Sequence, residues 1–391
     1  MYVRALATLL SQSTRSVLLL GPRQVGKSTL LHSLGPDLTL NLASPQTFRE
    51  FVARPERLEQ ELLAAPPTTR TVFLDEVQRV PALLDVVQVI LDEWPGRFRF
   101  LLSGSSARKL RRGHANLLPG RVHVHHLHPL DALELGTDFA LDRVMAHGSL
   151  PGITAEPNAA TRAADLMAYA DTYLREEIQA EALVRNVGGY ARLLELVAAS
   201  SGRVLNLQSL SSDAGLRHET ARRYVEVLED TLVAFRFPAF SGSDRASAVA
   251  HPKLFLFDLG VRNALLRRPL DRVLIDDRGL SFEHLVAYEL HRRCGSRWPE
   301  ARLFHFRTHA GAEVDFVLDV GGETWAIEVK ASTDVPNVRL AGFAALAERT
   351  EVKRKLVVYA GRRRLAVKGV DVLPFLDFVA LLGRETPRHS P

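Results

Sequence analysis

The chain has 391 residues, enough for two or three domains, and its apolar (46%) and charged (24%) fractions are ordinary for a globular protein. A single cysteine, Cys294, excludes an intrachain disulfide, and the longest apolar runs are too short to span a bilayer. With no leader pattern at the start, we expect a cytoplasmic protein without a membrane segment. The net charge of +5 and the pI near 9.5 permit a polyanionic partner without requiring one.

Residues 1–130 alternate short apolar runs with amphipathic stretches, a rhythm typical of a parallel sheet covered by helices. The apolar runs span residues 17–20, 71–74 and 98–102. We predict an α/β domain here, followed by a helical lid or linker over residues 131–185. Residues 186–250 predict a winged helix-turn-helix, and residues 251–391 return to mixed strands and helices, which predicts a third, α/β domain.

The first apolar run leads into a phosphate-binding motif. Residues 21–28 fit G-x-x-x-x-G-K-[ST] and stand between a strand and a helix that begins near Lys27. The glycines let backbone N–H groups turn toward phosphate oxygens. We expect Lys27 to reach the β- and γ-phosphates of ATP, and Ser28 to hold Mg²⁺. The predicted nucleotide-binding residues are Gly21, Pro22, Arg23, Gln24, Val25, Gly26, Lys27, Ser28 and Thr29.

A second motif follows about fifty residues later, where an apolar run ends in Asp75 and Glu76. Parallel sheets place their ligands at the carboxyl ends of their strands. We therefore expect Asp75 to support the Mg²⁺ shell and Glu76 to polarise the attacking water.

Two further residues are candidates for the same chemistry. Ser103 ends the third run, where it either senses the γ-phosphate or simply caps a strand. Arg121 precedes an alternating run and is a candidate arginine finger that enters a neighbouring subunit's site. Arg111 and Arg112 are rivals for that role, and an ordinary surface arginine is the alternative.

The winged-helix prediction depends on residues 207–237. A helix, a turn at Gly215 and a second helix over residues 217–229 are followed by an apolar strand over residues 232–237. The polar residues near the start of the second helix are predicted to contact DNA, and they are Arg217, His218, Thr220 and Arg223. The acidic residues of the same helix leave a packing module or a subunit contact as the alternative.

Near the C-terminus, two alternating runs flank Gly321-Gly322, which predicts a hairpin that sets Asp315 opposite Glu328. Like charges at such a pair require something positive between them, either Mg²⁺ or Lys330. Glu283 lies on the apolar face of an upstream helix and needs a partner as well. Together Glu283, Asp315, Glu328 and Lys330 resemble the metal-binding and water-activating set of PD-(D/E)XK nucleases, whose metal here would be Mg²⁺ or Mn²⁺. Arg307 and His309 should lie nearby.

These motifs resemble a large family of bacterial and archaeal AAA+-type ATPases that carry a C-terminal domain of unknown function. The resemblance is carried by GPRQVGKST at 21–29, LDEVQ at 74–78, SGS at 103–105, PGR at 119–121, FEH at 282–284, GAEVDF at 311–316 and IEVK at 327–330. It implies an ATP-binding core, a winged helix and a PD-(D/E)XK-like end, with Lys27, Ser28, Asp75 and Glu76 as ATPase residues and Ser103 at a position where threonine is commoner.

The sequence thus predicts a Mg²⁺-dependent ATPase that couples hydrolysis to DNA binding or remodelling, acting as a homo-oligomer such as a hexamer. Two alternatives stay open. One is a nucleotide-dependent regulatory switch that binds a protein partner, and the other is an active ATP-coupled DNA endonuclease.

Overall fold

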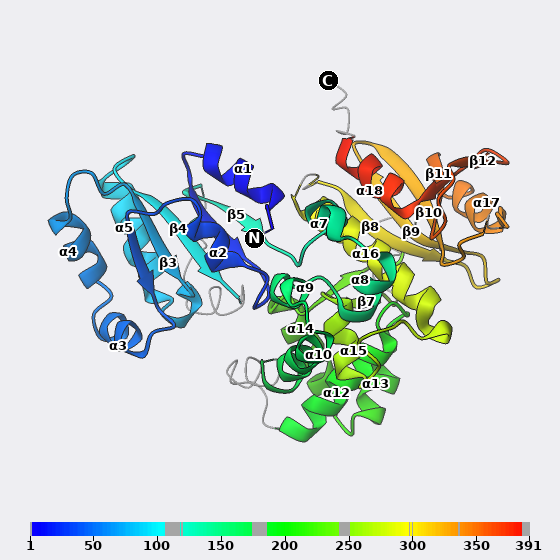
Figure 1. Ribbon diagram of the computed structural model, residues 1–391, viewed down its shortest axis with the longest axis horizontal. Helices are drawn as coiled ribbons and strands as arrows, with labels where there is room; N and C mark the ends of the chain where they lie inside the picture. The colour runs from blue at the N-terminus through cyan, green and yellow to red at the C-terminus, as the bar shows by residue number, and fades with distance from the viewer. Residues whose placement is uncertain are drawn as a thin grey trace. The chain divides into compact units, whose positions relative to one another are not determined.

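The computed structural model describes residues 2–105, 118, 120–173, 186–241, 251–296, 298, 300–334 and 337–384. The chain forms two compact units (Figure 1). The first comprises residues 1–130 together with 226–233, and the second comprises residues 131–225 together with 234–391. Within the described residues, every helix is too short or too polar to cross a membrane.

Five parallel strands form the sheet of the first unit, in the order β2-β3-β4-β1-β5. The strands are β1 (Ser16–Leu20), β2 (Leu38–Asn41), β3 (Thr71–Asp75), β4 (Arg99–Gly104) and β5 (Val122–His126). The three apolar runs found in the sequence correspond to β1, β3 and β4, with ends displaced by two residues at most. The predicted parallel sheet is confirmed, while β2 was not predicted.

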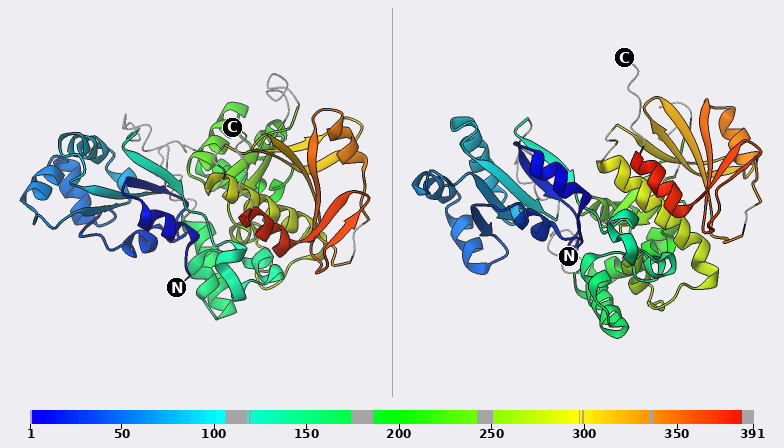
Figure 2. Two further views of the ribbon diagram at one scale, coloured as in Figure 1. Left: turned by 90° about the horizontal axis from the view of Figure 1, so that it is seen from above. Right: turned by 45° about the horizontal axis from the view of Figure 1, so that its top comes forward.

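Helices cover both faces of this sheet (Figure 2). They are α1 (Ala5–Gln12), α2 (Lys27–His32), α3 (Pro45–Ala53), α4 (Arg57–Ala64) and α5 (Ala82–Glu93). Leu18 and Leu74 point into an apolar cluster that also contains the buried side chains of α3, α4 and α5. Because side chains alternate along a strand, Phe73 faces the other way, where His32 of α2 packs edge-on against it with ring centroids 5.0 Å apart.

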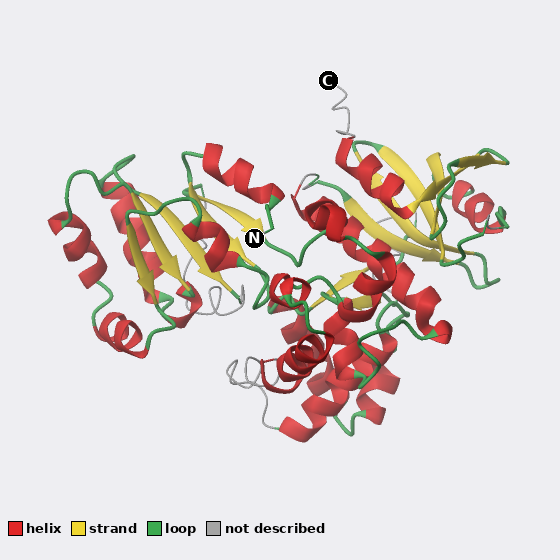
Figure 3. Cartoon of the chain, in the orientation of Figure 1, coloured by secondary structure: helices red, strands yellow, loops and turns green. Residues whose placement is uncertain are grey.

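The first part of the second unit is mainly helical (Figure 3). Its helices are α7 (Ala132–Leu135), α8 (Leu141–His147), α9 (Pro151–Ala155), α10 (Ala159–Ala168), α12 (Val187–Ser200), α13 (Leu207–Asp213), α15 (Leu259–Leu265) and the first part of α14 (His218–Asp230), whose residues from 226 on belong to the first unit. A π-helical turn over Tyr169–Tyr173 follows α10. Two antiparallel strands, β6 (Ala234–Phe237) and β7 (Lys253–Leu256), complete this part.

A six-stranded mixed sheet forms the rest of the second unit, in the order β12-β13-β11-β10-β9-β8. Its strands are β8 (Arg302–Arg307), β9 (Glu313–Val320), β10 (Glu323–Lys330), β11 (Val352–Tyr359), β12 (Leu365–Val367) and β13 (Val370–Pro374). The accompanying helices are α16 (Arg278–Ser296), α17 (Ala341–Ala347) and α18 (Phe375–Arg384). Phe343 and Leu346 of α17 join the apolar cluster on one face of the sheet, and α16 and α18 contact one another and the strands.

The predicted Gly-Gly hairpin joins β9 to β10. Val320 pairs with Glu323, as expected, and the register continues as far as Phe316 opposite Ile327. The pairing ends there, one pair before Asp315 and Glu328. Instead, Asp315 Oδ2 accepts a 2.7 Å hydrogen bond from the backbone N–H of Val329, because the side chain turns along the neighbouring strand.

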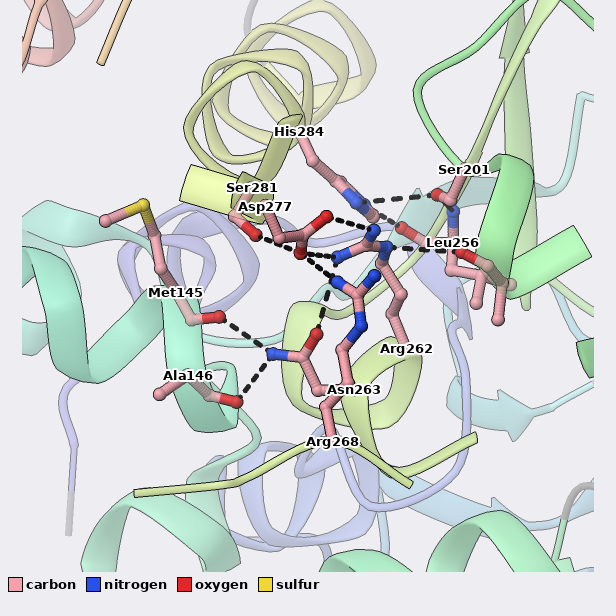
Figure 4. A network of polar contacts seen from close by, with 11 residues as sticks. Met145, Ala146, Ser201, Leu256, Arg262, Asn263, Arg268, Asp277, Ser281 and His284 are labelled. Atoms are coloured by element: carbon pink, nitrogen blue, oxygen red, sulfur yellow. Dashed lines mark hydrogen bonds and ion pairs between the residues drawn. The ribbon is translucent and has the colours of Figure 1, made fainter. Parts of the chain in front are cut away.

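A buried ion-pair network joins α15, the 3₁₀ turn η4 (Ile275–Asp277) and α16 in the second unit (Figure 4). Arg262 is fully buried and donates hydrogen bonds of 2.7 and 3.0 Å to the two carboxylate oxygens of Asp277. Arg268 forms an ion pair with the same carboxylate, and Ser281 Oγ donates to it at 2.9 Å. Three elements that are separate in sequence are thus held by one charged centre.

Candidate nucleotide site

The loop between β1 and α2 has the backbone shape that a phosphate-binding motif requires. Gly26 precedes α2 with φ of 93°, a left-handed conformation that favours glycine, and Gln24 has φ of 63°. Gly21 is required for a different reason, since a Cβ there would lie 2.2 Å from the carbonyl oxygen of Leu127. The two glycines of the motif are therefore each dictated by local geometry.

Lys27 is folded back onto the loop that carries it. Its side chain is buried, and Nζ donates 2.9 Å hydrogen bonds to the carbonyl oxygens of Gly21 and Pro22. The ammonium group therefore lies beside the backbone that is predicted to hold phosphate. A lysine in this place can exchange neutral carbonyl partners for anionic oxygens, which make stronger hydrogen bonds with it.

Three oxygen-bearing side chains meet at the carboxyl ends of the central strands. Ser28 Oγ donates to Asp75 Oδ1 at 2.9 Å, and Ser103 Oγ donates to the same carboxylate oxygen. The strand order explains the meeting, because β3, β4 and β1 are consecutive parallel neighbours. Hydroxyl and carboxylate oxygens are the ligands that Mg²⁺ prefers, so Ser28 and Asp75 fit the ion predicted for this place.

Ser103 is fully buried, and both of its hydrogen-bonding functions are in use. Besides donating to Asp75, its hydroxyl accepts a 2.9 Å hydrogen bond from the backbone N–H of Glu76. The single hydroxyl proton is therefore committed to Asp75. In this arrangement Ser103 positions Asp75 and Glu76, and its part as a γ-phosphate sensor stays a prediction.

Glu76 stands immediately after β3 in a left-handed conformation, with φ of 60°. Its carboxylate accepts a 2.6 Å hydrogen bond from the side-chain amide of Gln78, whose nitrogen also donates to Ser105 Oγ at 2.9 Å. Gln78 is buried, with 5% of its surface exposed. Neither Gln78 nor Ser105 was predicted from the sequence to have a role, although both lie within the LDEVQ and SGS motifs.

Arg4 is a second residue that the sequence analysis missed. This buried arginine donates a 2.7 Å hydrogen bond to the carbonyl oxygen of Val25 and a 2.6 Å bond to that of His128. It thereby connects the phosphate-binding loop to the segment that follows β5. No motif marks this arginine, and its two partners lie 21 and 124 residues away in sequence.

Arg121 precedes β5 and forms two hydrogen bonds with the Asp92 carboxylate, at 2.6 and 2.7 Å. β5 runs parallel to β1, with Ser16 opposite Val122 and Leu20 opposite His126. Arg121 therefore lies at the amino ends of the strands, about 16 Å of strand away from the loop at their carboxyl ends. Any contact with a nucleotide would have to be made in another copy of the chain. Arg111 and Arg112 lie outside the described residues.

The residues predicted to contact DNA lie at the start of α14 and just before it. Arg217, His218 and Arg223 are exposed, and Thr220 is half-buried. The opposite side of the helix carries Ala221, Tyr224, Val225 and Leu228, all of which are buried, as the periodicity predicted. An ion pair of 2.7 Å between Arg222 and Glu219 lies on the exposed side.

The C-terminal carboxylates have basic partners. Lys330 Nζ lies 3.1 Å from Glu328 Oε2, and Glu283 is bonded to Lys253, a residue that the sequence analysis did not consider. Arg307 and His309 are exposed at the end of β8 and in the loop after it. Among the residues that the structure describes, His, Cys, Asp and Glu form no group of three that could hold a metal ion.

Comparisons with known proteins bear on these sites. Residues 13–136 match the family model of an AAA domain. This part of the chain is an AAA-type P-loop nucleotide-binding domain. Residues 138–272 match a domain of unknown function (DUF8612), and residues 278–378 match another (DUF4143). The AAA domain of this chain is thus followed by two regions for which the family descriptions give no activity.

The chain is also similar to uncharacterized proteins of mycobacteria. It is 27% identical over 383 residues to Rv2008c of Mycobacterium tuberculosis, covering 94% of this chain and 81% of that protein. The same figures hold for Mb2031c of Mycobacterium bovis.

Among solved structures, the chain is similar to a RuvB variant of Thermotoga maritima, with 16% sequence identity and a TM-score of 0.29. The alignment covers 59% of this chain and 87% of the RuvB chain. It is also similar to the replication initiator DnaA bound to AMPPCP and single-stranded DNA, with 12% sequence identity and a TM-score of 0.28. That alignment covers 57% of this chain and 85% of the DnaA chain. At TM-scores this low, neither likeness supports an assignment of function.

Proposed function

We propose that this protein is a Mg²⁺-dependent ATPase that couples hydrolysis to the binding or remodelling of DNA. The observation that carries the ATPase assignment is the convergence of Ser28 and Ser103 on one carboxylate oxygen of Asp75, beside the loop that Lys27 folds onto. A purely structural role would not require a buried ammonium, a carboxylate and a hydroxyl at one sheet edge.

In this proposal each residue has a separate part. Lys27 leaves the carbonyl oxygens of Gly21 and Pro22 and binds the β- and γ-phosphates. Ser28 and Asp75 hold Mg²⁺, which neutralises phosphate charge when it is bound. Glu76, held by Gln78, accepts a hydrogen bond from the attacking water and orients it.

The arginine that stabilises the transferred charge comes from a second copy, with Arg121 as the candidate, so the active form is a homo-oligomer, such as a hexamer. Arg121 must then leave Asp92 to reach its neighbour. Exchange of one ion pair for another is a small change in free energy at an exposed position, which makes such a switch feasible.

The ATPase assignment is tested by Lys27→Ala and Glu76→Gln, each measured for nucleotide binding by calorimetry and for phosphate release. We expect Lys27→Ala to lose binding and turnover together, because the phosphates lose their buried cation. Glu76→Gln should retain binding and lose turnover by about a hundredfold or more. Glu56→Gln, at an exposed position just before α4, is the matched control. Normal turnover in both site variants would overturn the assignment.

The DNA part of the proposal is supported by the exposed Arg217, His218 and Arg223 at the start of α14, which form a basic edge opposite the buried face. We propose that residues 186–250 form a winged helix that follows a helical lid over residues 131–185, with the C-terminal domain at 251–391. Arg217→Glu with Arg223→Glu should weaken duplex DNA binding and flatten its dependence on salt. The control is Arg54→Glu with Arg57→Glu. It makes the same change of charge near the start of α4, away from α14. Equal binding by wild type and the α14 variant would overturn the DNA contact.

A regulatory switch is the second candidate, and the Glu219–Arg222 ion pair favours it by neutralising part of the same surface. The discriminating measurement is the ATPase rate with and without duplex, branched and single-stranded DNA. The ATPase rate of a remodelling enzyme should be stimulated by at least one of these DNAs. A switch should hydrolyse ATP slowly, at a rate that DNA does not change.

A further inference from the structure

One of the carboxylates that the sequence assigned to a metal site, Glu283, pairs with a buried lysine, as does the neighbouring Glu313. Lys253 begins β7, and its Nζ lies 2.8 Å from Glu283 Oε1 on α16 and 3.1 Å from Glu313 Oε1 on β9. Its side chain is only 5% exposed. The ammonium group thus reaches the cluster from an element that lies outside both the hairpin and the helix on which the prediction was based.

The other two predicted ligands also have partners within the protein. Asp315 Oδ2 accepts the backbone N–H of Val329 at 2.7 Å, and Glu328 Oε2 pairs with Lys330 at 3.1 Å. A divalent ion needs several oxygens directed at one point about 2 Å away. Here one oxygen of each carboxylate is directed at an ammonium group or a backbone N–H instead of at a common point.

The charges of the cluster keep Lys253 in place. Burial by itself lowers the pKa of this ammonium group, but Glu283 and Asp315 more than compensate and raise its pKa above the ordinary value. A buried lysine with two carboxylate partners is costly to remove, because each carboxylate would be left uncompensated.

We propose that Lys253 is the built-in cation of this cluster, that it takes the place a divalent metal was expected to occupy, and that the C-terminal domain therefore neither binds Mg²⁺ or Mn²⁺ there nor cleaves DNA. The proposal is independent of the ATPase assignment, since it concerns other residues. It assigns Glu283 and Glu313 to binding an internal lysine, with the charge of Asp315 nearby. This end of the protein is then a binding or packing module rather than a nuclease.

The test is a titration of the full chain with Mn²⁺ in the absence of nucleotide, in which electron paramagnetic resonance measures the bound Mn²⁺. We expect the wild type and Asp315→Asn to give the same weak, non-specific binding. Lys253→Met should bind one Mn²⁺ per chain about tenfold or more tightly than the wild type, and Lys253→Met with Asp315→Asn should lose that gain. Lys253→Arg retains the charge and Lys368→Met removes an exposed charge elsewhere, so neither should gain Mn²⁺.

Because Lys253→Met buries unpaired carboxylates, its folding is checked by circular dichroism and by thermal unfolding with and without Mn²⁺. Stabilisation by Mn²⁺ in Lys253→Met but not in the wild type supports the proposal. The proposal can also be refuted without the Lys253→Met variant. Mn²⁺ binding that Asp315→Asn or Glu328→Gln abolishes, or DNA nicking that Glu328→Ala abolishes, would show that a metal occupies the site despite Lys253. A folded Lys253→Met that gains no Mn²⁺ would also contradict it.

Discussion

The side-chain amide of Gln78 donates a 2.6 Å hydrogen bond to the carboxylate of Glu76, two residues earlier in the chain. The same nitrogen is anchored by Ser105 at the end of the neighbouring strand. Glu76 therefore depends on a buried partner for its direction, and its left-handed backbone alone does not set it.

Gln78→Ala should accordingly lower kcat about tenfold and leave ATP affinity within about threefold, because a misdirected base loses its geometry without changing the phosphate contacts. Steady-state phosphate release and calorimetric ATP binding, measured on the same preparation, separate the two effects. Gln60→Ala, at an exposed position of α4, should change neither. If Gln78→Ala weakened binding and left kcat unchanged, Gln78 would belong to the binding surface instead.

Gly21→Ala should destabilise the nucleotide-free protein by about 1–3 kcal/mol, since the new methyl group would meet the carbonyl oxygen of Leu127 at 2.2 Å. Chemical unfolding in the absence of nucleotide measures this cost. Gly279→Ala on α16 is the control, because a Cβ there meets no atom within 4 Å and should be neutral or slightly stabilising. Equal stability of Gly21→Ala and wild type would mean that the loop moves aside without cost.

Glu289→Gln should make the second unit more stable at alkaline pH. Burial raises the pKa of Glu289 to about 7, even though the backbone N–H of Ala132 and the charge of Arg293 oppose this rise. A carboxyl group whose pKa is raised in the folded state loses stability progressively as pH rises above its unfolded pKa, and the full cost is reached above its folded pKa. We therefore expect the variant to exceed wild type by about 2–3 kcal/mol near pH 8 and to match it near pH 4, about the unfolded pKa of glutamate.

Urea unfolding at the two pH values gives this comparison, with Glu348→Gln, at an exposed position, as the control that should show no pH-dependent difference. A gain of equal size at both pH values would mean that packing, and not ionisation, separates glutamate from glutamine at position 289.

Asp277→Asn should cost about 3–5 kcal/mol, because the fully buried Arg262 would lose its charged partner. Burial alone would raise the pKa of Asp277, but Arg262, Ser281 and Arg268 outweigh it, and the net pKa lies below the ordinary value. This contribution to stability is present above the unfolded pKa and is lost as pH falls through the folded one. Asp276→Asn, one residue away and exposed, should have little effect. Thermal unfolding at neutral and acidic pH measures the stability lost in Asp277→Asn and shows whether that loss shrinks as pH falls.

The parts of the fold that were predictable from sequence are those encoded over short distances. An apolar run that ends in a polar residue marks β1, β3 and β4, and the spacing of Ala221, Tyr224, Val225 and Leu228 marks the buried face of α14. The strand β2 was missed because it is short and only alternate residues of it are apolar, so the pattern falls below the length that distinguishes a strand from a loop.

Contacts between distant segments could not be predicted in the same way. Lys253 bonds carboxylates 30 and 60 residues further on, and nothing in the residues around it marks it as their partner. The hairpin arithmetic correctly gave the pairs from Val320–Glu323 to Phe316–Ile327, but it assumed a regular ladder and so did not foresee that Asp315 bonds the backbone of Val329. The role of Arg4 likewise could not be predicted, because its partners, the carbonyl oxygens of Val25 and His128, come close to it only in the folded chain.

The phosphate-binding loop rests on residues 127 and 128: Gly21 fits beneath the carbonyl oxygen of Leu127, and Arg4 ties Val25 to His128. A loop held in this manner has little freedom to reshape alone. If an incoming anion draws Lys27 away from the loop carbonyls, a shift of the loop would pass through these contacts to residues 127 and 128, just before the chain passes from the first unit to the second after Leu130. Phosphate binding at the loop would then displace the backbone at the point where the chain leaves the first unit.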